Sequence, residues 1–483
     1  MNYFSIDYLI VYTFLAITLI IGIRAGKGIK DIKEYALANR MFGTAALVLT
    51  WLATDVAGET ILDMAGSVRT EGILQPLAIF GGWGIAMLMQ ALIFAPKVVH
   101  FHNCITMGDI MGELYKRPSQ VITGILTFLT ALCITGMELT VLGILFNSLL
   151  GINYQWAILI GGLILIGYTV HGGIKAVTYT DLFQFLVLLA VIPIITIITL
   201  QQAGGIKQIF MQVPATKFQI FDHPKFVHYF ALFLSLSVFQ FSVIDPALMQ
   251  RMLMGRTKQQ LRDQFFIVAA FLFALMLSLL MLGLASIVLF PTDPEMPIVP
   301  HIIHHLLPIG IKGLAAAGLL AITMSTFDSF LHAAGLTLVH DVISPLYNRK
   351  GQKLNELKWT RYVTVFIGFI AIAVALARAE NLYGFVLISY QFTGPLLAFP
   401  LFAGILGLKP DRYAFYIASI ATLAIFAIAK LLLPEKYAYI ATLISVVSNG
   451  IIFLGIHVIK NKGFSTINRA KSEEYLWQPQ HTI

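Results

Sequence analysis

Long apolar runs separated by short polar connections make up almost the whole sequence. A helix that spans a membrane needs about 20 consecutive apolar residues. Windows of this length predict thirteen spans, near residues 5–23, 44–66, 74–98, 119–150, 154–171, 174–201, 227–250, 263–290, 311–338, 359–379, 381–405, 411–432 and 437–459. Charged residues make up only 12% of the chain, against roughly 25% in soluble domains. We therefore expect an all-α polytopic membrane protein with no room for a soluble catalytic domain.

The basic residues are unevenly divided between the two predicted sides of the membrane. With the N-terminus outside, 24 of the 32 Lys and Arg residues fall on the inner side, which is the positive-inside pattern of membrane proteins. The net charge of +8 therefore indicates topology rather than a nucleic-acid partner. We expect a multi-pass protein of the cell (inner) membrane, with the N-terminus outside and the C-terminus cytoplasmic; its oligomeric state stays open.

Six carboxylates stand out within the apolar stretches of the predicted spans: Asp55, Glu59, Asp63, Glu138, Asp181 and Asp328. A charged side chain at the centre of a span costs roughly 2.5–3.5 kcal/mol to insert, and those that are retained usually mark an ion or substrate path. The first three are four residues apart, so a helix would place them on one face. The small pair Ala57-Gly58 could unwind that helix, as in the interrupted spans of transporters.

Five stretches, in order along the chain, resemble motifs of the sodium/solute symporter family, which includes sodium-coupled proline, sugar, pantothenate and sialic acid carriers. They are Lys33 to Arg40, Ala53 to Gly58, Gly172 to Val177 with Thr180, Asp181 and Gln184, Asp245-Pro246 with Gln250-Arg251, and Ala321 to Thr326. The resemblance covers about Ser5 to Lys460. Glu59 and Asp328 depart from the family pattern, and the seventh span has no glycine between Val227 and Met254 at which to unwind.

The resemblance implies a leucine-transporter-like core of five plus five helices in an inverted repeat. The expected divisions are a first helix and basic inner loop (1–43), the first repeat (44–201), the second repeat (227–405), two peripheral helices (406–460) and a cytoplasmic tail (461–483).

The family's shared sodium site would involve the carbonyl oxygens of Ala53, Val56 and Ile322 and the hydroxyls of Ser325 and Thr326. Sodium prefers hard oxygen ligands, which unwound backbone and hydroxyls supply at the membrane midplane. The alternative is that the two hydroxyls only bond back to carbonyls one turn earlier. Asp55 lies just before the possible break at Ala57-Gly58. It could stabilise the sodium site, or it could cap the half-helix that follows the break.

A second cation or proton site is expected at Asp181, Asp328, Ser329 and His332. The resemblance implies that relatives with a second sodium site use the position of Asp181 and hydroxyls of the ninth span. Two carboxylates at one site would raise the pKa of one of them unless a cation lies between them. The alternative is a structural pair between Asp328 and His332, which lies one turn further along.

Polar residues on other core spans are candidates for the substrate site: Glu59, Thr60, Asp63, Glu138, Gln240 and Gln391. The three acids have no basic residue at comparable depth, so the pocket would favour an amine or another cationic group. Each neutral residue could instead make a hydrogen bond between helices, and Glu138 could be a protonated structural residue.

These observations predict a sodium-coupled symporter, not an enzyme, that imports a small organic solute such as an amino acid. Sodium is the expected cofactor, and the solute and the lipid bilayer are the expected partners. Proton coupling through Asp181, Asp328 and His332 is one alternative, and a transporter-like sensor is another. His301, His304 and His305 lack a fourth zinc ligand, and we expect them in a solvated loop.

Overall fold

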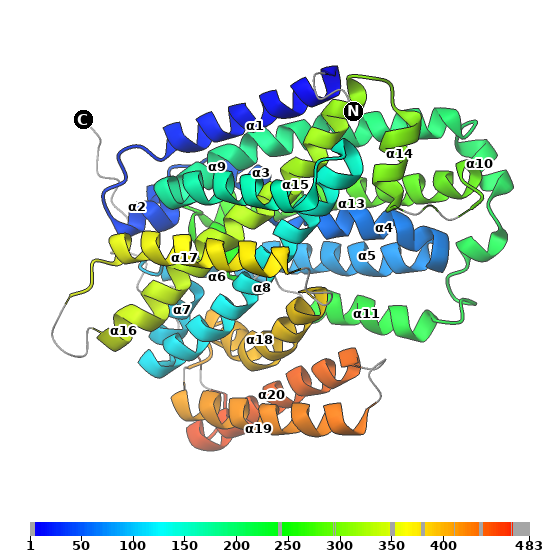
Figure 1. The fold of residues 1–483 in the computed structure, drawn as a ribbon. Helices are drawn as coiled ribbons and strands as arrows, with labels where there is room; N and C mark the ends of the chain where they lie inside the picture. The colour runs from blue at the N-terminus through cyan, green and yellow to red at the C-terminus, as the bar shows by residue number, and fades with distance from the viewer. Residues whose placement is uncertain are drawn as a thin grey trace.

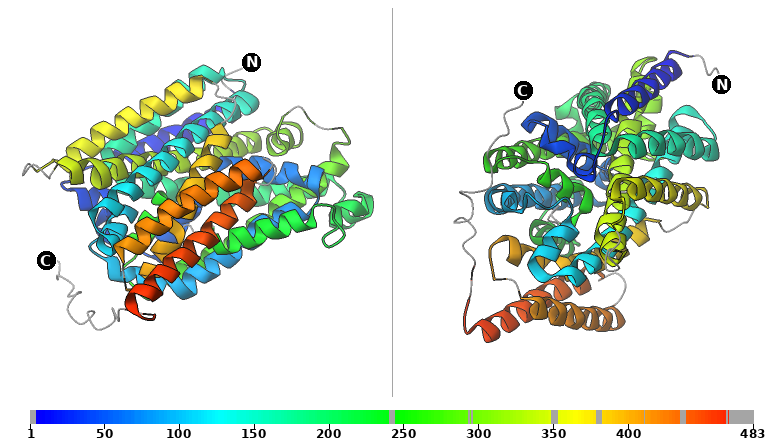
Figure 2. Two further views of the ribbon diagram at one scale, coloured as in Figure 1. Left: turned by 90° about the horizontal axis from the view of Figure 1, so that it is seen from below. Right: turned by 90° about the vertical axis from the view of Figure 1, so that its left-hand side faces the viewer.

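The computed structural model describes residues 5–239, 244–292, 294, 296–347, 353–377, 382–409, 411–433, 438–464 and 466. Within these ranges the chain is helical without strands, apart from an isolated bridge between Leu408 and Thr466. Most of the long helices lie alongside one another in a single bundle (Figures 1 and 2). The expected all-α architecture is confirmed.

The elements comprise ten long helices and a set of shorter ones in the described residues. The long helices are α1 Ile6–Ala25, α5 Leu74–Met89, α8 Arg117–Leu150, α9 Tyr154–Gln202, α13 Lys258–Leu289, α15 Ile311–Thr337, α17 Glu356–Leu376, α18 Leu382–Ile405, α19 Arg412–Leu432 and α20 Ala438–Asn461. The shorter helices are α2 Ile32–Leu37, α3 Thr44–Asp55, α4 Gly58–Glu71, α6 Ala95–Val98, α7 Met107–Tyr115, α10 Ile206–Gln212, α11 Phe226–Phe239, α12 Pro246–Leu253, α14 Ile298–Leu306 and α16 Ser344–Tyr347. Two π-helical segments, η2 Gln90–Phe94 and η6 Leu338–Ile343, continue α5 and α15.

Ten helical segments in the described parts of the chain are long and apolar enough to cross a membrane. The predicted number of thirteen therefore stays a prediction. Two of the predicted windows, 44–66 and 227–250, are each divided between two short helices, α3 with α4 and α11 with α12. Neither half is long enough to pass for a span, because a straight crossing needs about 20 residues.

The 49-residue helix α9 covers two predicted spans and is broken at Gly173. A straight helix of that length would measure about 73 Å, more than twice the roughly 30 Å of a hydrocarbon core. Gly173 has φ +50° and ψ −149°, and a Cβ atom there would lie 2.6 Å from the carbonyl oxygen of Tyr35. Only glycine combines this backbone conformation with so close an approach.

Helix α15 is the most enclosed of the long helices in the described residues, and every residue from Ala315 to Thr337 is buried. It packs most extensively against α8 and α9 and also contacts α1 and α17 (Figure 1). A helix buried on all sides can carry polar residues only where neighbouring helices satisfy them. The buried polar residues of α15 therefore indicate where a functional site lies in the bundle.

The C-terminal helices α19 and α20 lie side by side at one edge of the bundle and join it through α18 (Figures 1 and 2). An ion pair of 2.7 Å between Lys460 and Asp411 connects their ends. At another edge, His301, His304 and His305 lie on α14. The expectation of a loop there is wrong, since their spacing of three and four residues forms helical turns.

Candidate functional site

The break between α3 and α4 is the local feature on which the site depends. Val56 and Ala57 leave the helical conformation, with φ/ψ of −85°/92° and −76°/156°. The last carbonyls of α3 therefore lose the N–H groups that a continuing helix would supply. Ala57 occupies the N-cap of α4, so the alternative in which Asp55 caps this helix is wrong. The role of Asp55 in stabilising the sodium site stays a prediction.

Gly58 lets the start of α4 contact α15 directly. A Cβ atom at this position would lie 2.3 Å from Cγ2 of Thr323 on α15 and 3.3 Å from Oε2 of Glu138 on α8. No side chain fits at the first of these distances without movement of one helix. The break in the second predicted span is therefore packed tightly against two helices.

The predicted sodium ligands from α3 and α15 meet beside this break. The hydroxyl of Ser325 lies 2.7 Å from the carbonyl oxygen of Ala53 and 2.9 Å from that of Ile322. Thr326 donates to the Ile322 carbonyl at 3.1 Å. The back-bonding that we considered as an alternative is present, and Ser325 also reaches across to the broken helix.

A narrow space adjoins these oxygen atoms. It is lined by Ala53, Val56, Gln184, Phe185, Leu188, Ala321, Ile322 and Ser325. The side chain of Gln184 is 1% exposed, and neither its amide oxygen nor its nitrogen has a hydrogen-bond partner among the described residues. Gln184 was predicted only as part of a family motif, and it lines the same space as the predicted sodium ligands.

One turn before Ala53 on α3 and one turn after Ser325 on α15, a guanidinium group lies between two residues of the second predicted site. Arg251 on α12 contacts Oδ2 of Asp181 at 3.1 Å and Oγ of Ser329 at 2.5 Å. It also donates to the carbonyl of Thr50, whose hydroxyl bonds Asp181 at 2.5 Å. Arg251 and Asp181 are both fully buried. Arg251 was predicted only as part of a family motif, and the structure adds it to this predicted site.

Asp328 and His332 lie in this region but do not form the predicted pair. Oδ2 of Asp328 accepts a hydrogen bond of 2.6 Å from the hydroxyl of Tyr168 on α9. The imidazole of His332 lies 3.1 Å from the side-chain nitrogen of Gln250 and packs against the ring of Tyr35. The structure therefore joins Asp181 and Ser329 through Arg251 and leaves His332 in a separate contact.

The described residues that were predicted to bind substrate come from three helices, α8, α4 and α18. Glu138 is fully buried opposite the start of α4. Its two carboxylate oxygens and Oε2 of Glu59 have no hydrogen-bond partner in the described part of the chain. On α4, Thr60 is buried and Asp63 is exposed; on α18, Gln391 is half-buried. Gln240 lies outside the described residues.

Two further polar residues border this region without having been predicted as site residues. Asp245 caps α12 by accepting from the backbone N–H groups of Ala247 and Leu248. Its other oxygen accepts a 3.0 Å hydrogen bond from Tyr390 on α18. The signal was present in the sequence, because Asp followed by Pro is a strong N-terminal helix signature. The second break therefore needs no glycine.

Comparison with protein families decides what kind of protein carries this geometry. A model of the sodium:solute symporter family matches residues 35–408. The chain belongs to the sodium:solute symporter family. As a member it is a multi-pass membrane transporter, not an enzyme, and the family implies sodium as the coupling ion.

Curated relatives of this symporter share about a quarter of its residues. The high-affinity proline transporter PutP of Bacillus subtilis is 24% identical over 397 residues, covering 78% of this chain and 81% of the relative. A sodium/proline symporter of Staphylococcus saprophyticus is also 24% identical, over 422 residues, covering 82% of this chain and 81% of that protein. These identities show that the proteins are related, but they do not identify the solute that this chain transports.

Solved structures show the fold of this symporter. A sodium-coupled sialic acid symporter in a substrate-bound outward-open state superposes with a TM-score of 0.81, at 18% identity, covering 95% of this chain and 98% of that one. Mhp1, a nucleobase-cation-symport-1 family transporter, gives a TM-score of 0.59 at 17% identity, covering 91% and 98%. The fold is therefore that of leucine-transporter-like carriers.

Proposed function

We propose that this sodium symporter imports a small organic solute that carries an amino or other cationic group, driven by one sodium ion bound between α3 and α15. The observation that carries the proposal is the contact of 2.7 Å between the Ser325 hydroxyl and the Ala53 carbonyl at the end of a broken helix. Unwound carbonyls of this kind bind coupling ions in transporters with interrupted spans.

The ligands proposed for sodium are the carbonyl oxygens of Ala53, Val56 and Ile322 and the hydroxyls of Ser325 and Thr326. All are neutral oxygens, which bind an ion firmly enough to select it and weakly enough to release it. The amide oxygen of Gln184 borders the same space and is a further candidate of the same chemical type. Asp55, the last residue of α3, would contribute a negative charge nearby.

An amine-bearing solute is supported by the acids around the start of α4. Glu138 and Glu59 hold carboxylate oxygens that the described residues do not satisfy, and a buried carboxylate without a partner is costly. A cationic group of the solute would supply that partner. Thr60, Asp63 and Gln391, and Gln240 outside the described residues, remain candidates for further contacts.

The second predicted cation site is better explained with Arg251 as its cation. The guanidinium already neutralises Asp181 and occupies the hydroxyl of Ser329. A second sodium ion would have to displace it, and a buried charge separated from its partner is destabilised by several kcal/mol. We therefore propose one coupled sodium, with Asp328 as the remaining acid of this group and the residue through which proton coupling would act.

We also propose that residues 44–201 and 227–405 form the two inverted halves, with 1–43, 406–460 and 461–483 outside them. In each half, the first predicted span is divided between two short helices, α3 with α4 in the first half and α11 with α12 in the second. Paired interruptions at corresponding places are the usual mark of a substrate site in such transporters.

Uptake by the purified protein in proteoliposomes tests the proposal. The panel contains amino acids including proline, simple amines, sugars and carboxylates, each with an inward sodium gradient and with potassium in its place. We expect sodium-dependent uptake of an amine-bearing compound, and loss of that uptake in Glu138→Gln. Uptake of anionic compounds alone would overturn the substrate class. Uptake driven equally by a pH gradient without sodium would establish proton coupling instead.

A further inference from the structure

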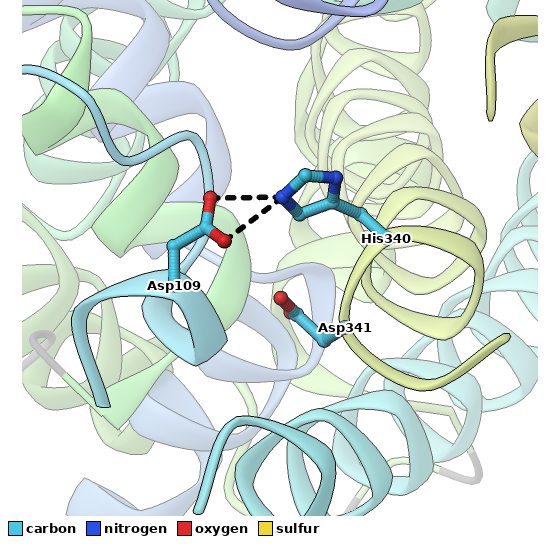
Figure 3. Close-up of side chains that lie close together, drawn as sticks. All are labelled: Asp109, His340 and Asp341. Carbon is cyan, nitrogen blue, oxygen red and sulfur yellow. Dashed lines mark hydrogen bonds and ion pairs between the residues drawn. The ribbon is translucent and has the colours of Figure 1, made fainter. Parts of the chain in front are cut away.

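At the end of the bundle where α7 meets η6, three ligand-type side chains converge outside the sodium site (Figure 3). They are Asp109 on α7 and His340 and Asp341 on η6. One nitrogen or oxygen atom from each lies within 4.8 Å of the other two. We propose that these residues bind a divalent transition-metal ion of the zinc type, independently of the coupling sodium.

The histidine is held as metal-binding histidines usually are. Nε2 of His340 points at Asp109, 2.9 Å from each carboxylate oxygen. On the other side of the ring, Nδ1 lies 2.8 Å from Oε2 of Glu356. Ser344 fixes Glu356 by donating to its other oxygen at 2.5 Å. A carboxylate behind the imidazole fixes the tautomer and orientation of a metal ligand.

Asp341 supplies the observation that points to a ligand. Its side chain is fully buried, and Oδ1 accepts from Thr106 at 2.7 Å and from Gln120 at 3.3 Å. Oδ2 is buried and has no hydrogen-bond partner among the residues that the structure describes. A Cβ atom on Gly108 would lie 2.5 Å from this oxygen. The chain therefore makes room for a carboxylate oxygen that it leaves unsatisfied.

Charge and distance both favour a small divalent cation. Three carboxylates, on Asp109, Asp341 and Glu356, surround one imidazole, so the cluster stays negative even when the imidazole is charged. Zinc bonds of about 2.0–2.2 Å place tetrahedral ligands roughly 3.3–3.6 Å apart, and the three ligand atoms, which lie within 4.8 Å of one another, would draw together around the ion. Mixed imidazole and carboxylate ligands suit zinc-type ions better than calcium or magnesium.

The site is open to solvent on one side, since the side chains of Asp109 and His340 are 19% and 18% exposed. A metal ion could therefore enter without unfolding the bundle, and solvent would supply the fourth ligand. The ion would connect α7 in the first proposed half with η6 in the second.

Metal binding to purified full-length protein tests the inference. The protein is prepared without a histidine tag, stripped with a chelator, and titrated with buffered Zn²⁺ and with Co²⁺ as a visible-absorption probe. We expect one equivalent of tightly bound metal in the wild type and its loss in Asp341→Asn and His340→Gln. Glu356→Gln should keep the site but weaken it roughly 10–100-fold, because it removes only the residue behind the imidazole.

Surface histidines provide the matched control. His301 and His305 on α14 have ring centres 4.3 Å apart and could bind zinc weakly, so the double variant His301→Gln/His305→Gln should retain the tight equivalent. Loss of that equivalent in the α14 variant, or no binding in the wild type, would overturn the inference.

A further variant tests the site by adding a spectroscopic signal, in case Asp341→Asn or His340→Gln fails to fold. His340→Cys should give a cobalt–thiolate charge-transfer band. Absence of this band in folded protein would equally count against the metal site.

Discussion

At the scale of single residues, the hydroxyl of Ser325 can form a hydrogen bond to a carbonyl of its own helix and still serve as a ligand for an ion. A hydroxyl has one proton to donate and two lone pairs to offer. Ser325 can donate its proton to Ile322 or Ala53, each within 2.9 Å, and still present oxygen to an ion. The hydrogen bond would then orient the ligand instead of replacing it.

Removing the two hydroxyls should weaken sodium binding without unfolding the protein. We expect Ser325→Ala with Thr326→Ala to raise the sodium concentration for half-maximal uptake by roughly tenfold or more, because a polar contact to a charged group contributes about 1.5–3 kcal/mol. Ser278→Ala, which removes an exposed back-bonded hydroxyl on α13, is the control and should leave uptake unchanged. Sodium dependence equal to the wild type in well-expressed double variant would refute the sodium site.

The buried pair of Arg251 and Asp181 should be strongly coupled in stability. Arg251→Gln leaves the Asp181 carboxylate buried without its cation, which should cost roughly 3–5 kcal/mol. The double variant Arg251→Gln/Asp181→Asn removes both charges and should recover a large part of that loss. Thermal unfolding in detergent measures all three variants. Additive losses would show that the two side chains do not depend on each other.

At the scale of elements, one of the two helix breaks is marked by small residues in the sequence, whereas the other has a different local cause. The pair Ala57-Gly58 marked the first break because small residues lower the barrier to unwinding. A glycine was expected at the second break, and the seventh span has none. In the structure, α12 instead begins with Asp245 as its cap and Pro246 as its first residue. A cap is a local hydrogen bond that hydropathy windows do not register, although its residue signature was visible.

The contact between α4 and α15 should tolerate no added carbon at Gly58. We expect Gly58→Ala to lose roughly 1–3 kcal/mol of stability, as overpacked cores do, because its Cβ would meet Cγ2 of Thr323. Thr323→Ser removes that methyl group and keeps the hydroxyl that bonds Leu320, so it should rescue Gly58→Ala. The measurement is thermal unfolding combined with uptake.

Gly66 on the same helix gives the matched control, because a Cβ there would have no atom within 4 Å. Gly66→Ala should be neutral or stabilising by up to about 1 kcal/mol, since alanine favours the helix over glycine. If both alanine variants lost equal stability, the contact with Thr323 would not be the reason.

At the scale of the whole molecule, hydropathy predicted that the chain is a helical membrane bundle but not which side chains meet inside it. Arg251 illustrates the limit, because it was noted only as part of a family motif, while its guanidinium lies fully buried against Asp181. His332 illustrates it too, since proximity along one helix face suggested Asp328 as partner and a different helix supplied Gln250. The meeting of Asp181 with Ser329 could be anticipated only through family motifs.

The predicted orientation of the bundle in the membrane can be checked by cysteine labelling. In a background with Cys104→Ala and Cys133→Ala, Lys207→Cys should react with a membrane-impermeant maleimide on intact cells, because the residue is exposed on the predicted outer side. Lys353→Cys, exposed on the predicted inner side, should react only after permeabilisation. The reverse pattern would invert the topology.

The complete enclosure of α15 has a consequence for how such a protein can diversify. From Ala315 to Thr337 no side chain faces lipid or water, so this helix has no neutral face on which substitutions could accumulate. A lineage that acquires a new cargo would change the surrounding helices α4, α8 and α9, which are only partly buried. Across descendants with different cargoes, α15 should therefore drift more slowly than the surfaces around it.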